Sequence, residues 1–428
     1  FRTVALIKSI SGIRGTIGGK PGETLSPLDV VKFTAAYGSW LIEKTGNRKV
    51  VIGRDGRISG PLIQSIVIST SHNPKEWNAL KLLNSKGEFI SGPDGKEVLE
   101  IAAAENFSFA PVDKLGTVRE DETYLQKHIE AITSLNLVDI AAIKARNFKI
   151  VVDAVNSTGA IFVPEMLRAL GVQSEHIIVI NGEVNGKFAH NPEPLPENLG
   201  ELSNMVRKSG ADMGIAVDPD VDRLCFVCED GSMFGEEYTL VAVADYVLSR
   251  QPGNTVSNMS STRALKDITL KHGGQYYPSA VGEVNVVTRM KEVNAVIGGE
   301  GNGGIILPAL HYGRDALVGI ALFLTHLSKA QKSIKQLRRT YPDYFISKNK
   351  LELEPGVDVK EVFEKIKTKY KSHPVNTEDG LKIEFDNDWV HLRTSNTEPI
   401  IRIYAESSFE STANNIALRL MQDIRELK

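Results

Sequence analysis

Short runs of β-branched and apolar residues alternate along the chain with segments in which apolar residues recur at helical spacing. Runs of the first kind lie at residues 48–53, 148–153, 177–180, 213–217 and 224–228, and helical spacing is found at residues 26–43, 122–135 and 164–170. Strands that alternate with helices are typical of layered α/β folds with parallel or mixed sheets. The pattern therefore predicts an α/β protein.

Polar and turn-rich stretches divide this pattern into four segments. A chain of 428 residues rarely folds around a single hydrophobic core, and at about 150 residues per domain we expect several domains. The separating stretches are polar at residues 104–121, turn-rich at 249–254 and charged at 340–350. The expected domains are residues 1–146, 147–250, 251–345 and 346–428.

The charges of the chain nearly cancel. Its 50 basic and 53 acidic residues leave a formal net charge of -3, which gives no reason to expect nucleic acid or a membrane surface as a partner. No apolar run reaches the roughly 18 residues of a membrane span, and the start of the chain does not resemble a secretory signal. We therefore expect a soluble, cytoplasmic protein that binds anions only locally.

The two cysteines, Cys225 and Cys228, lie in one apolar run. Side chains at this spacing point to opposite faces of a strand, so a shared metal ion or a redox pair is disfavoured. Two buried, reduced thiols fit a reducing compartment.

Three aspartates at alternate positions follow the predicted strand 213–217. Asp218, Asp220 and Asp222 can converge on one hard cation, and the lack of nearby histidine or cysteine ligands favours magnesium over zinc. An EF-hand is disfavoured, because Arg223 takes the place of its glycine and an apolar run follows. A solvated acidic turn is the other interpretation, but Pro219 holds the carboxylates together.

A second candidate is the turn at residues 70–74, which contains Ser71, His72 and Pro74. Because residues 75–83 have helical spacing, the serine would lie just before helical amides, where an anion is stabilised, and could carry a phosphate as a covalent intermediate. Taken alone, the same turn is a good helix cap, which is the commoner interpretation.

The glycine-rich run at residues 298–304 formally contains the spacing of a dinucleotide-binding loop. That interpretation requires a helix to open there, but residues 305–308 are strand-like and end in proline. Glu300 and Asn302 instead suit hydrogen bonds to neighbouring sugar hydroxyls, and a plain glycine-rich turn is the alternative.

A fourth run, residues 393–399, connects strands predicted at 389–392 and 400–404. Arg393 and the hydroxyls and amides that follow it can form a phosphate cradle, and Arg402 on the next strand adds a second guanidinium. A polar hairpin turn is the alternative.

Five motifs occur in a distinctive order. They are the basic loop Ser-Gly-Ile-Arg-Gly at residues 11–15, the serine turn, the aspartate loop, the glycine-rich loop and the Arg393 loop. Over nearly its whole length the chain thereby resembles the α-D-phosphohexomutase superfamily of phosphoglucomutases, phosphomannomutases and phosphoglucosamine mutases. The resemblance implies a heart-shaped protein of four domains around a central cleft, three of them related α/β domains and the last α+β. It also implies an isomerase that interconverts hexose 1-phosphate and hexose 6-phosphate through a phosphoserine enzyme and a hexose 1,6-bisphosphate.

The resemblance assigns roles to the motifs. Ser71 would carry the phosphate and complete a Mg²⁺ site with Asp218, Asp220 and Asp222. The catalytic residues would be Ser71, Arg14, Lys81, His72 and Arg223, with Lys81 as the candidate for proton transfer. Glu300 and Asn302 would bind the sugar, and the phosphate that does not react would be held by Arg393, Ser395, Asn396, Thr397 and Arg402.

Two features depart from the family. Many relatives have a histidine where this chain has Gly304, and His311 and Arg314 are candidates to replace it. In addition, only a short stretch separates Arg57 from Ser71, although a parallel crossover needs about a dozen or more residues besides the returning strand. We hypothesise that the natural chain has further residues there, in which case its intact mass differs from 46.9 kDa.

Other functions fit the same residues. A phosphatase or a sugar bisphosphate synthase could use the same serine, and a non-catalytic sensor could bind the same sugar phosphates. The sequence leaves open glucose, mannose and glucosamine phosphates, since a carboxylate such as Glu300 accepts from a hydroxyl or an ammonium group. We favour glucosamine or mannose phosphate, and the oligomeric state is open.

Overall fold

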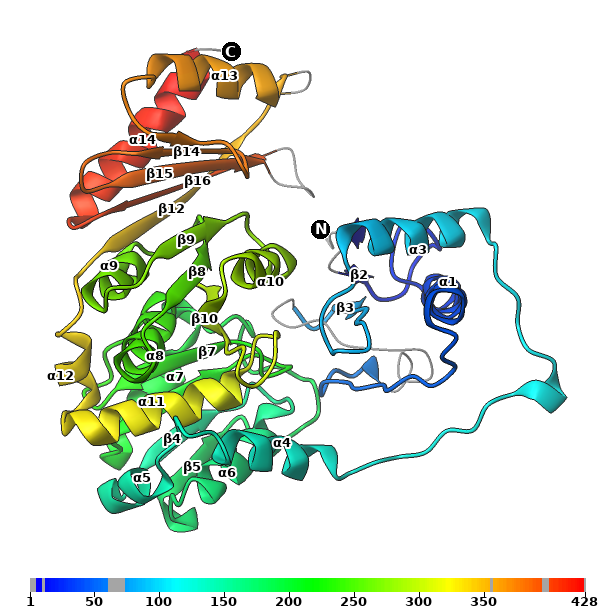
Figure 1. The fold of residues 1–428 in the computed structure, drawn as a ribbon, viewed down its shortest axis with the longest axis horizontal. Coiled ribbons are helices and arrows are strands. Elements are labelled where there is room, and N and C mark those ends of the chain that lie inside the picture. Colours follow the sequence, from blue (N-terminus) through cyan, green and yellow to red (C-terminus); the bar gives the residue numbers. More distant parts are fainter. Residues whose placement is uncertain (1–4, 10–11, 61–73, 355–356, 395–399, 427–428) are drawn as a thin grey trace. The chain divides into compact units, whose positions relative to one another are not determined.

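The chain divides into two compact units. The structure, a computed structural model, describes residues 5–9, 12–60, 74–354, 357–394 and 400–426 (Figure 1). The first unit consists of Phe1–Thr239 and Gly303–Lys335, and the second consists of Leu240–Asn302 and Gln336–Lys428. Each unit combines helices with a parallel or mixed sheet, so the predicted α/β class is confirmed.

An antiparallel sheet begins the first unit. Its strands β1 (Leu6–Ser9), β2 (Gly12–Thr16) and β3 (Trp77–Leu80) lie in the order β1-β2-β3. The helices α1 (Pro27–Thr45) and α3 (Gly92–Ala104) share a core with this sheet. A capping box of Ser26 and Asp29 starts α1, which confirms the helix predicted at residues 26–43.

The strand predicted at residues 48–53 is wrong. These residues lie in no strand or helix, and Val50, Val51 and Ile52 are 43%, 66% and 44% exposed. A cavity of about 790 Å³ adjoins Val50 and Val51. A strand needs a neighbour for its N–H and C=O groups, and the stretch from Arg57 to Ser71 is too short for both a crossover and a returning parallel strand. The apolar pattern is present, but none of the described strands pairs with it.

The helix predicted at residues 75–83 is also wrong. Residues 77–80 form β3, which pairs with β2 in the register Arg14↔Ala79. A short apolar segment can take either form, and the free edge of β2 decides for a strand. Residues 75–83 therefore offer no helical amides to an anion on Ser71, and Ser71 and His72 themselves lie outside the described residues.

A mixed sheet in the order β5-β4-β6-β7 forms the rest of the first unit. The strands β4 (Ile150–Asp153), β5 (Ile177–Ile180) and β6 (Met213–Val217) are parallel, and β7 (Leu224–Cys228) is antiparallel to β6. All four confirm predicted strands. The other elements are α4 (Tyr124–Thr133), α5 (Ile140–Arg146), α6 (Gly159–Ala169), α7 (Gly200–Ser209), α11 (Ala316–Ala330), β11 (Gly304–Ile306) and the 3-10 turns η1 (Val112–Lys114), η2 (Ser174–His176) and η3 (Pro196–Asn198).

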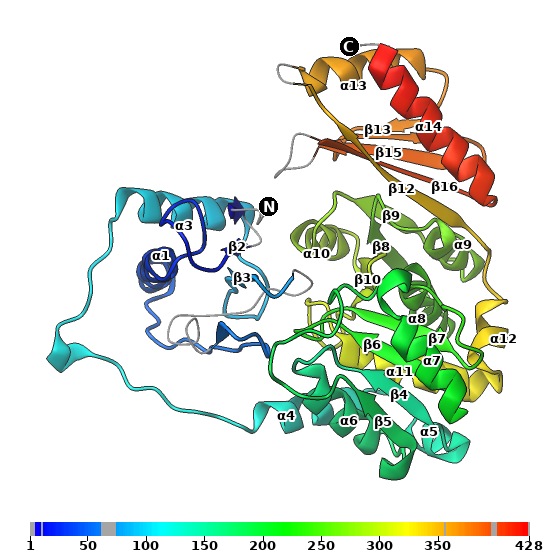
Figure 2. The same cartoon turned by 180° about the vertical axis from the view of Figure 1, so that it is seen from behind.

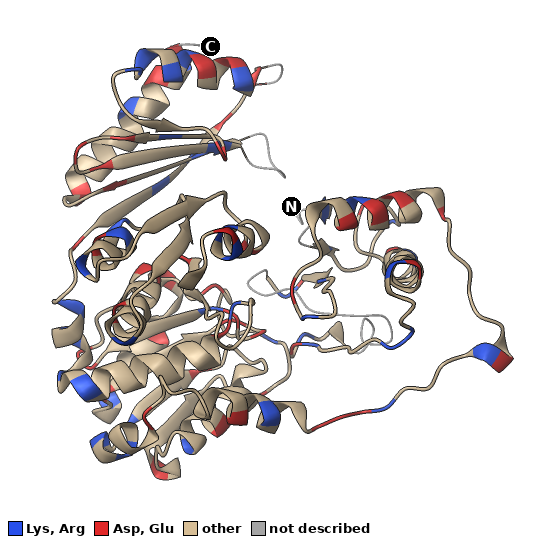
Figure 3. Cartoon of the chain, in the orientation of Figure 1, with Lys and Arg blue, Asp and Glu red and all other residues tan. Residues whose placement is uncertain are grey.

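Helix α11 is the most buried helix of this unit. It contacts α4, α5, α6 and β7, and its ribbon carries almost no charged residues (Figure 3). A helix that is apolar on most sides is expected to be covered on most sides. Because α11 starts directly after Asp315, the loop before it is fixed close to α4.

Parallel strands form the first sheet of the second unit. Strand β8 (Asn254–Asn258) lies between β9 (Tyr276–Ser279) and β10 (Ala295–Glu300) and is parallel to both. The helices near it in the chain are α8 (Glu236–Arg250), α9 (Ala264–Lys271), α10 (Glu283–Glu292) and α12 (Ile334–Arg338). Both β8 and β10 end in polar residues, Asn258 and Glu300, at the same edge of the sheet.

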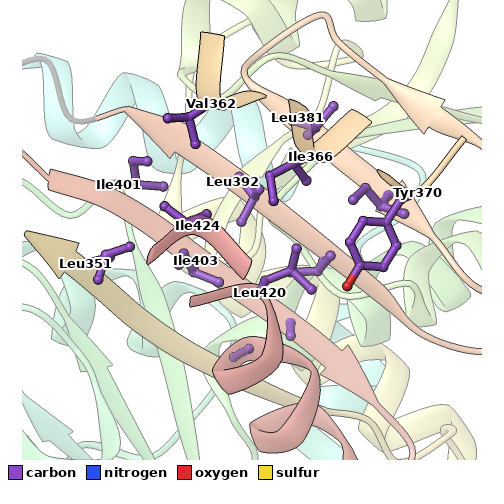
Figure 4. Packing of buried hydrophobic residues seen from close by; sticks show 14 residues of the cluster. Leu351, Val362, Ile366, Tyr370, Leu381, Leu392, Ile401, Ile403, Leu420 and Ile424 are labelled. Carbon is purple, nitrogen blue, oxygen red and sulfur yellow. The ribbon is translucent and has the colours of Figure 1, made fainter. Parts of the chain in front are cut away.

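The second unit ends in an antiparallel sheet with the order β12-β16-β15-β14-β13. Its strands are β12 (Phe345–Glu352), β13 (Val375–Asn376), β14 (Leu381–Glu384), β15 (Trp389–Thr394) and β16 (Ile400–Ser407). The helices α13 (Val359–Lys369) and α14 (Glu410–Glu426) cover one face of it (Figure 2). Ile366, Leu392, Ile403 and Leu420 fill the core between them (Figure 4), which leaves the opposite face to polar side chains such as Arg393.

Both cysteines are free and buried on β7, as predicted. In the part of the chain that the structure describes, no helix combines the length and the apolar character that crossing a membrane requires.

Candidate active site

The aspartate loop begins where β6 ends, inside the first unit. Asp218 is fully buried, and its Oδ1 accepts hydrogen bonds from the backbone N–H groups of Asp222 and Arg223, both at 3.0 Å. These bonds fold the loop back on itself, with Val221 at a positive φ of 61°. As a result, one oxygen each of Asp218, Asp220 and Asp222 lies within 4.8 Å of the others.

Each of these carboxylates also keeps one buried oxygen that has no hydrogen-bond partner among the described residues. The atoms are Asp218 Oδ2, Asp220 Oδ1 and Asp222 Oδ1. Burial, followed by the charges of Asp222 and Asp220, raises the pKa of Asp218 well above its usual value. A cation would satisfy all three oxygens and remove this electrostatic cost, so the residues fit a hard divalent ion.

Two cationic side chains contact the same carboxylates. Lys81, which directly follows β3, lies with its Nζ 2.5 Å from Asp220 Oδ2 and 3.2 Å from Asp222 Oδ2. Arg314 Nη2 lies 2.7 Å from Asp222 Oδ2. Burial opposes the charge of Lys81, but Asp220 and Asp222 outweigh it and raise the pKa of Lys81. Burial likewise opposes the charge of Asp222, and Arg314, Lys81 and Arg223 outweigh it and lower the pKa of Asp222.

Arg14 and Arg223 complete this group of cations. Arg14 lies on β2, and burial, with the charges of Arg223 and Arg314, lowers its pKa. Arg223 is held through Nη1 by Glu193, 3.0 Å from its Oε1. The structure thus places Lys81, Arg223 and Arg314 at the aspartate loop, and Arg14 lies near enough to Arg223 and Arg314 for their charges to lower its pKa.

Sequence reasoning missed an anchor beside the serine turn. Arg57 is 1% exposed, pairs with Asp55 and donates through Nη1 to the backbone oxygens of Pro74 and Trp77, at 2.8 and 3.1 Å. It fixes the chain directly after the turn. The signal was the charged run Arg54-Asp55-Gly56-Arg57, in which a buried ion pair is not recognisable without the fold.

In the second unit, Glu300 and Asn302 are adjacent, as predicted. Asn302 Nδ2 donates to Glu300 Oε2 at 3.4 Å, and Glu300 is 4% exposed. The other oxygen of Glu300 accepts from Asn258 Nδ2 at 2.9 Å and from the backbone N–H of Gly282 at 3.2 Å. The sequence did not single out Asn258, at the end of β8, or Gly282, directly before α10.

Cationic residues form a row across the last sheet. Arg393 on β15 is paired in register with Arg402 on β16, which is paired in turn with Lys350 on β12. Like charges directly opposite each other are unfavourable, so the row favours a bound anion. Arg393 Nε lies 2.8 Å from Asp379 Oδ2. Ser395, Asn396 and Thr397, predicted to share this site, lie outside the described residues.

A histidine links two parts of the second unit. His391 on β15 is 1% exposed, with its Nδ1 2.9 Å from Ser260 Oγ and its Nε2 2.6 Å from the backbone oxygen of Asp379. Because a carbonyl only accepts, Nε2 carries the proton and Nδ1 accepts from Ser260. Burial lowers the pKa of His391 to about 4, and the charges of Lys382 and Arg393 add to this effect.

Four family models match the chain in succession. They describe phosphoglucomutase/phosphomannomutase alpha/beta/alpha domain I at residues 6–68 and 62–109, domain II at 126–231, domain III at 235–344 and the C-terminal domain at 349–422. Together they cover most of the chain.

Named relatives match over almost their full length. A phosphoglucomutase/phosphomannomutase of Thermococcus kodakarensis is 32% identical over 96% of this chain and 98% of its own. A phosphoglucosamine/phosphogalactosamine mutase of Sulfurisphaera tokodaii is 30% identical over 96% and 97%. A crystal structure of a phosphoglucomutase/phosphomannomutase family protein from Burkholderia thailandensis shares the fold, with a TM-score of 0.82 and 24% identity over 98% of this chain and 96% of its own.

The same comparisons bear on the short connection after Arg57. The alignment with the Thermococcus protein spans 456 positions, although this chain has 428 residues. The domain I match is broken into two parts that meet at residues 62–68. The break in the domain I match lies where we hypothesise that the natural chain has further residues, between Arg57 and Ser71.

Proposed function

The chain belongs to the phosphoglucomutase/phosphomannomutase family and is a phosphohexomutase, and we propose that it transfers a phosphoryl group between the C1 and C6 oxygens of a hexose through phosphorylated Ser71. The four expected domains, residues 1–146, 147–250, 251–345 and 346–428, are part of this proposal. So is a cytoplasmic location, which the two free thiols favour.

The observation that carries the proposal is the set of three buried carboxylate oxygens without a partner among the described residues. In the proposed enzyme, Asp218, Asp220 and Asp222 hold Mg²⁺ together with Ser71. When bound, the ion supplies positive charge that offsets the charge of the phosphoryl group in transfer.

Cationic side chains of the protein also offset negative charge of the phosphates. Each phosphate brings about -1.5 to -2 charges at neutral pH, which Arg14, Lys81 and Arg314 help to offset. The raised pKa of Lys81 keeps it protonated in the substrate-free protein, so it can donate hydrogen bonds to a phosphate, and Lys81 is also the proposed residue for proton transfer.

Residues of the second unit are proposed to bind the sugar and the phosphate that does not react. Glu300 and Asn302 bind the sugar hydroxyls, and Arg393 and Arg402, with Ser395, Asn396 and Thr397, hold the phosphate that does not react. In the first transfer, the bond from Ser71 Oγ to phosphorus breaks as a sugar hydroxyl oxygen bonds to phosphorus, and the proton of that hydroxyl passes to Ser71 Oγ, which gives hexose 1,6-bisphosphate. After this intermediate has turned around, Ser71 Oγ bonds to its other phosphorus, the bond from that phosphorus to the sugar oxygen breaks, and the proton of Ser71 passes to the released sugar oxygen, which gives the isomeric monophosphate.

Phosphorus NMR tests the proposal directly. Glucosamine, mannose and glucose 1-phosphates are each incubated with the enzyme, Mg²⁺ and a trace of the matching 1,6-bisphosphate. The expected result is equilibration of at least one pair of monophosphates, fastest for glucosamine or mannose, and loss of this activity in the Ser71→Ala variant.

Other outcomes would identify the alternatives. Release of inorganic phosphate indicates a phosphatase, and accumulation of bisphosphate indicates a synthase. Binding of a sugar phosphate without any turnover indicates a sensor. Unchanged turnover in Ser71→Ala overturns the proposed mechanism.

A further inference from the structure

A cluster of two histidines and one aspartate lies beside the aspartate loop in the first unit. His128 on α4 and His311 both face Asp315, with their Nε2 atoms 2.8 and 3.0 Å from the same oxygen, Asp315 Oδ2. Asp315 is 4% exposed and lies directly before α11. None of the five sequence motifs includes His128 or Asp315.

The composition of the cluster resembles a metal site, but its hydrogen bonds favour another function. The backbone N–H of Gly313 donates to His311 Nδ1 at 3.0 Å, so the proton of neutral His311 resides on Nε2. A metal ion would need the lone pair of that nitrogen. The histidines therefore donate to Asp315, and the three residues form a hydrogen-bonded clamp.

Both oxygens of Asp315 are fully used in this clamp. Oδ2 accepts from the two histidines, and Oδ1 accepts from the backbone N–H groups of Leu317 and Val318 at the start of α11, at 2.8 and 3.2 Å. Burial alone would raise the pKa of Asp315, but the hydrogen bonds from His128 and His311 lower it. The position of Asp315 is thus fixed from α4, from its own loop and from α11.

The residues on either side of Asp315 contact the aspartate loop. Arg314 Nη2 lies 2.7 Å from Asp222 Oδ2, and the backbone N–H of Ala316 donates to the backbone oxygen of Val221 at 3.1 Å. Val221 lies between Asp220 and Asp222 at a positive φ. A displacement of Asp315 would therefore shift a charge contact and a backbone contact of the aspartate loop together.

We infer that His128, His311 and Asp315 are positioning residues that hold Arg314 and Ala316 against the aspartate loop and so set the spacing of its carboxylates for the metal ion. The inference rests on the proposed magnesium site. Groups that orient metal ligands from outside typically change metal affinity by about 10- to 100-fold when they are lost.

Binding of Mn²⁺, followed by electron paramagnetic resonance of the free ion, tests the clamp without any assay of activity. His128→Leu removes the donor to Asp315, and we expect the Kd for Mn²⁺ to rise about tenfold. His128→Gln places an amide N–H near the position of Nε2, and its Kd is expected to stay within about twofold of the wild-type value. If His128→Leu does not fold, His311→Leu serves as the test instead, because it removes the other donor to Asp315.

A matched control separates the clamp from general packing of α11. Lys329, at the far end of the same helix, pairs with Asp139 at 2.7 Å, and Lys329→Gln removes that contact. The Kd for Mn²⁺ should not change in this variant. Wild-type affinity in folded His128→Leu, or equal losses in His128→Leu, His128→Gln and Lys329→Gln, would overturn the inference.

The test by Mn²⁺ affinity does not depend on whether the protein catalyses the proposed reaction. If the wild type binds Mn²⁺ but interconverts no sugar phosphate, the proposed function fails while the Kd values still decide on the clamp. If the wild type is active, His128→Leu should lower kcat more than it changes KM for the sugar phosphate, and excess Mg²⁺ should restore part of the loss.

Discussion

Lys81 and Arg314 form ion pairs with carboxylates that a metal ion would also contact. The pairs Lys81–Asp220 and Arg314–Asp222 offset part of the negative charge of the aspartate loop. Asp218 is different, because its Oδ1 is used by backbone N–H groups and its buried Oδ2 has no hydrogen-bond partner in the part of the chain that is described. The three aspartates therefore contribute differently to folding and to metal binding.

Asp218→Asn should separate these two contributions. The amide oxygen can still accept from Asp222 and Arg223, so the loop should keep its conformation, while the charge at Oδ2 is lost. We expect the Kd for Mg²⁺ to rise at least about tenfold and turnover to fall by about 100-fold, with little change in thermal stability. Isothermal titration calorimetry and a melting curve check this, and an unchanged Kd would contradict the metal site.

Lys81→Met should have the opposite effect on the metal. Removal of the ammonium group leaves Asp220 and Asp222 without one of their cations, so Mg²⁺ should bind at least as tightly as in the wild type. Turnover should nevertheless fall by about 100-fold or more, because a charge and a proton donor for the phosphoryl group are lost. Calorimetry and steady-state kinetics on one preparation test both parts. A weaker affinity for Mg²⁺ would mean that Lys81 mainly supports the loop.

At the scale of elements, the strands were predictable where a partner strand exists. Residues 177–180 and 213–217 form β5 and β6 as expected, because β4 lies between them in the sheet. Residues 48–53 have a similar apolar run and form no strand. The difference lies in the neighbours, which a local pattern does not contain.

Gly303 shows how an element constrains a loop residue. It has a φ of +86°, and a Cβ atom built there would lie 2.2 Å from the backbone oxygen of Leu224 on β7. Gly303→Ala should therefore lower the free energy of unfolding by at least about 2 kcal/mol, since strain and a backbone clash act together. Urea denaturation measures the change.

Gly210→Ala is the matched control for this prediction. Gly210 also has a positive φ, +61°, but a Cβ atom there would meet nothing within 4 Å. Gly210→Ala should lower the free energy of unfolding by only about 1 kcal/mol, because the strain of the positive φ acts alone. Equal losses in the two variants would show that the contact with Leu224 contributes nothing.

At the scale of the whole molecule, His391 gives the second unit a dependence on pH. In the folded protein its pKa is lowered to about 4 by burial, against about 6.5 for an exposed histidine. Above pH 6.5 both the folded and the unfolded state carry the neutral ring, so His391 adds no pH dependence. As the pH falls from 6.5 to 4, the unfolded state binds a proton that the folded state does not, and stability decreases.

Between pH 6.5 and pH 4, the free energy of unfolding should decrease by on the order of 3 kcal/mol, since each tenfold change in proton affinity corresponds to about 1.4 kcal/mol. In His391→Gln, which cannot titrate, this part of the decrease should vanish. Urea unfolding followed by the fluorescence of Trp389, in the same sheet, reports on the second unit. Equal slopes of stability against pH in the two proteins would contradict the prediction.

The sequence alone determined the α/β class, most strands and the order of the five motifs. Its spacing of carboxylates also predicted a metal site at Asp218, Asp220 and Asp222, while Lys81 and Arg14 became candidates only through the resemblance to the phosphohexomutases. Only the tertiary structure decided that residues 77–80 form a strand, that Arg57 anchors Pro74 and that His128 reaches Asp315. These outcomes depend on groups far apart in the chain, and local patterns carry no information on which distant partner a side chain or strand edge will meet.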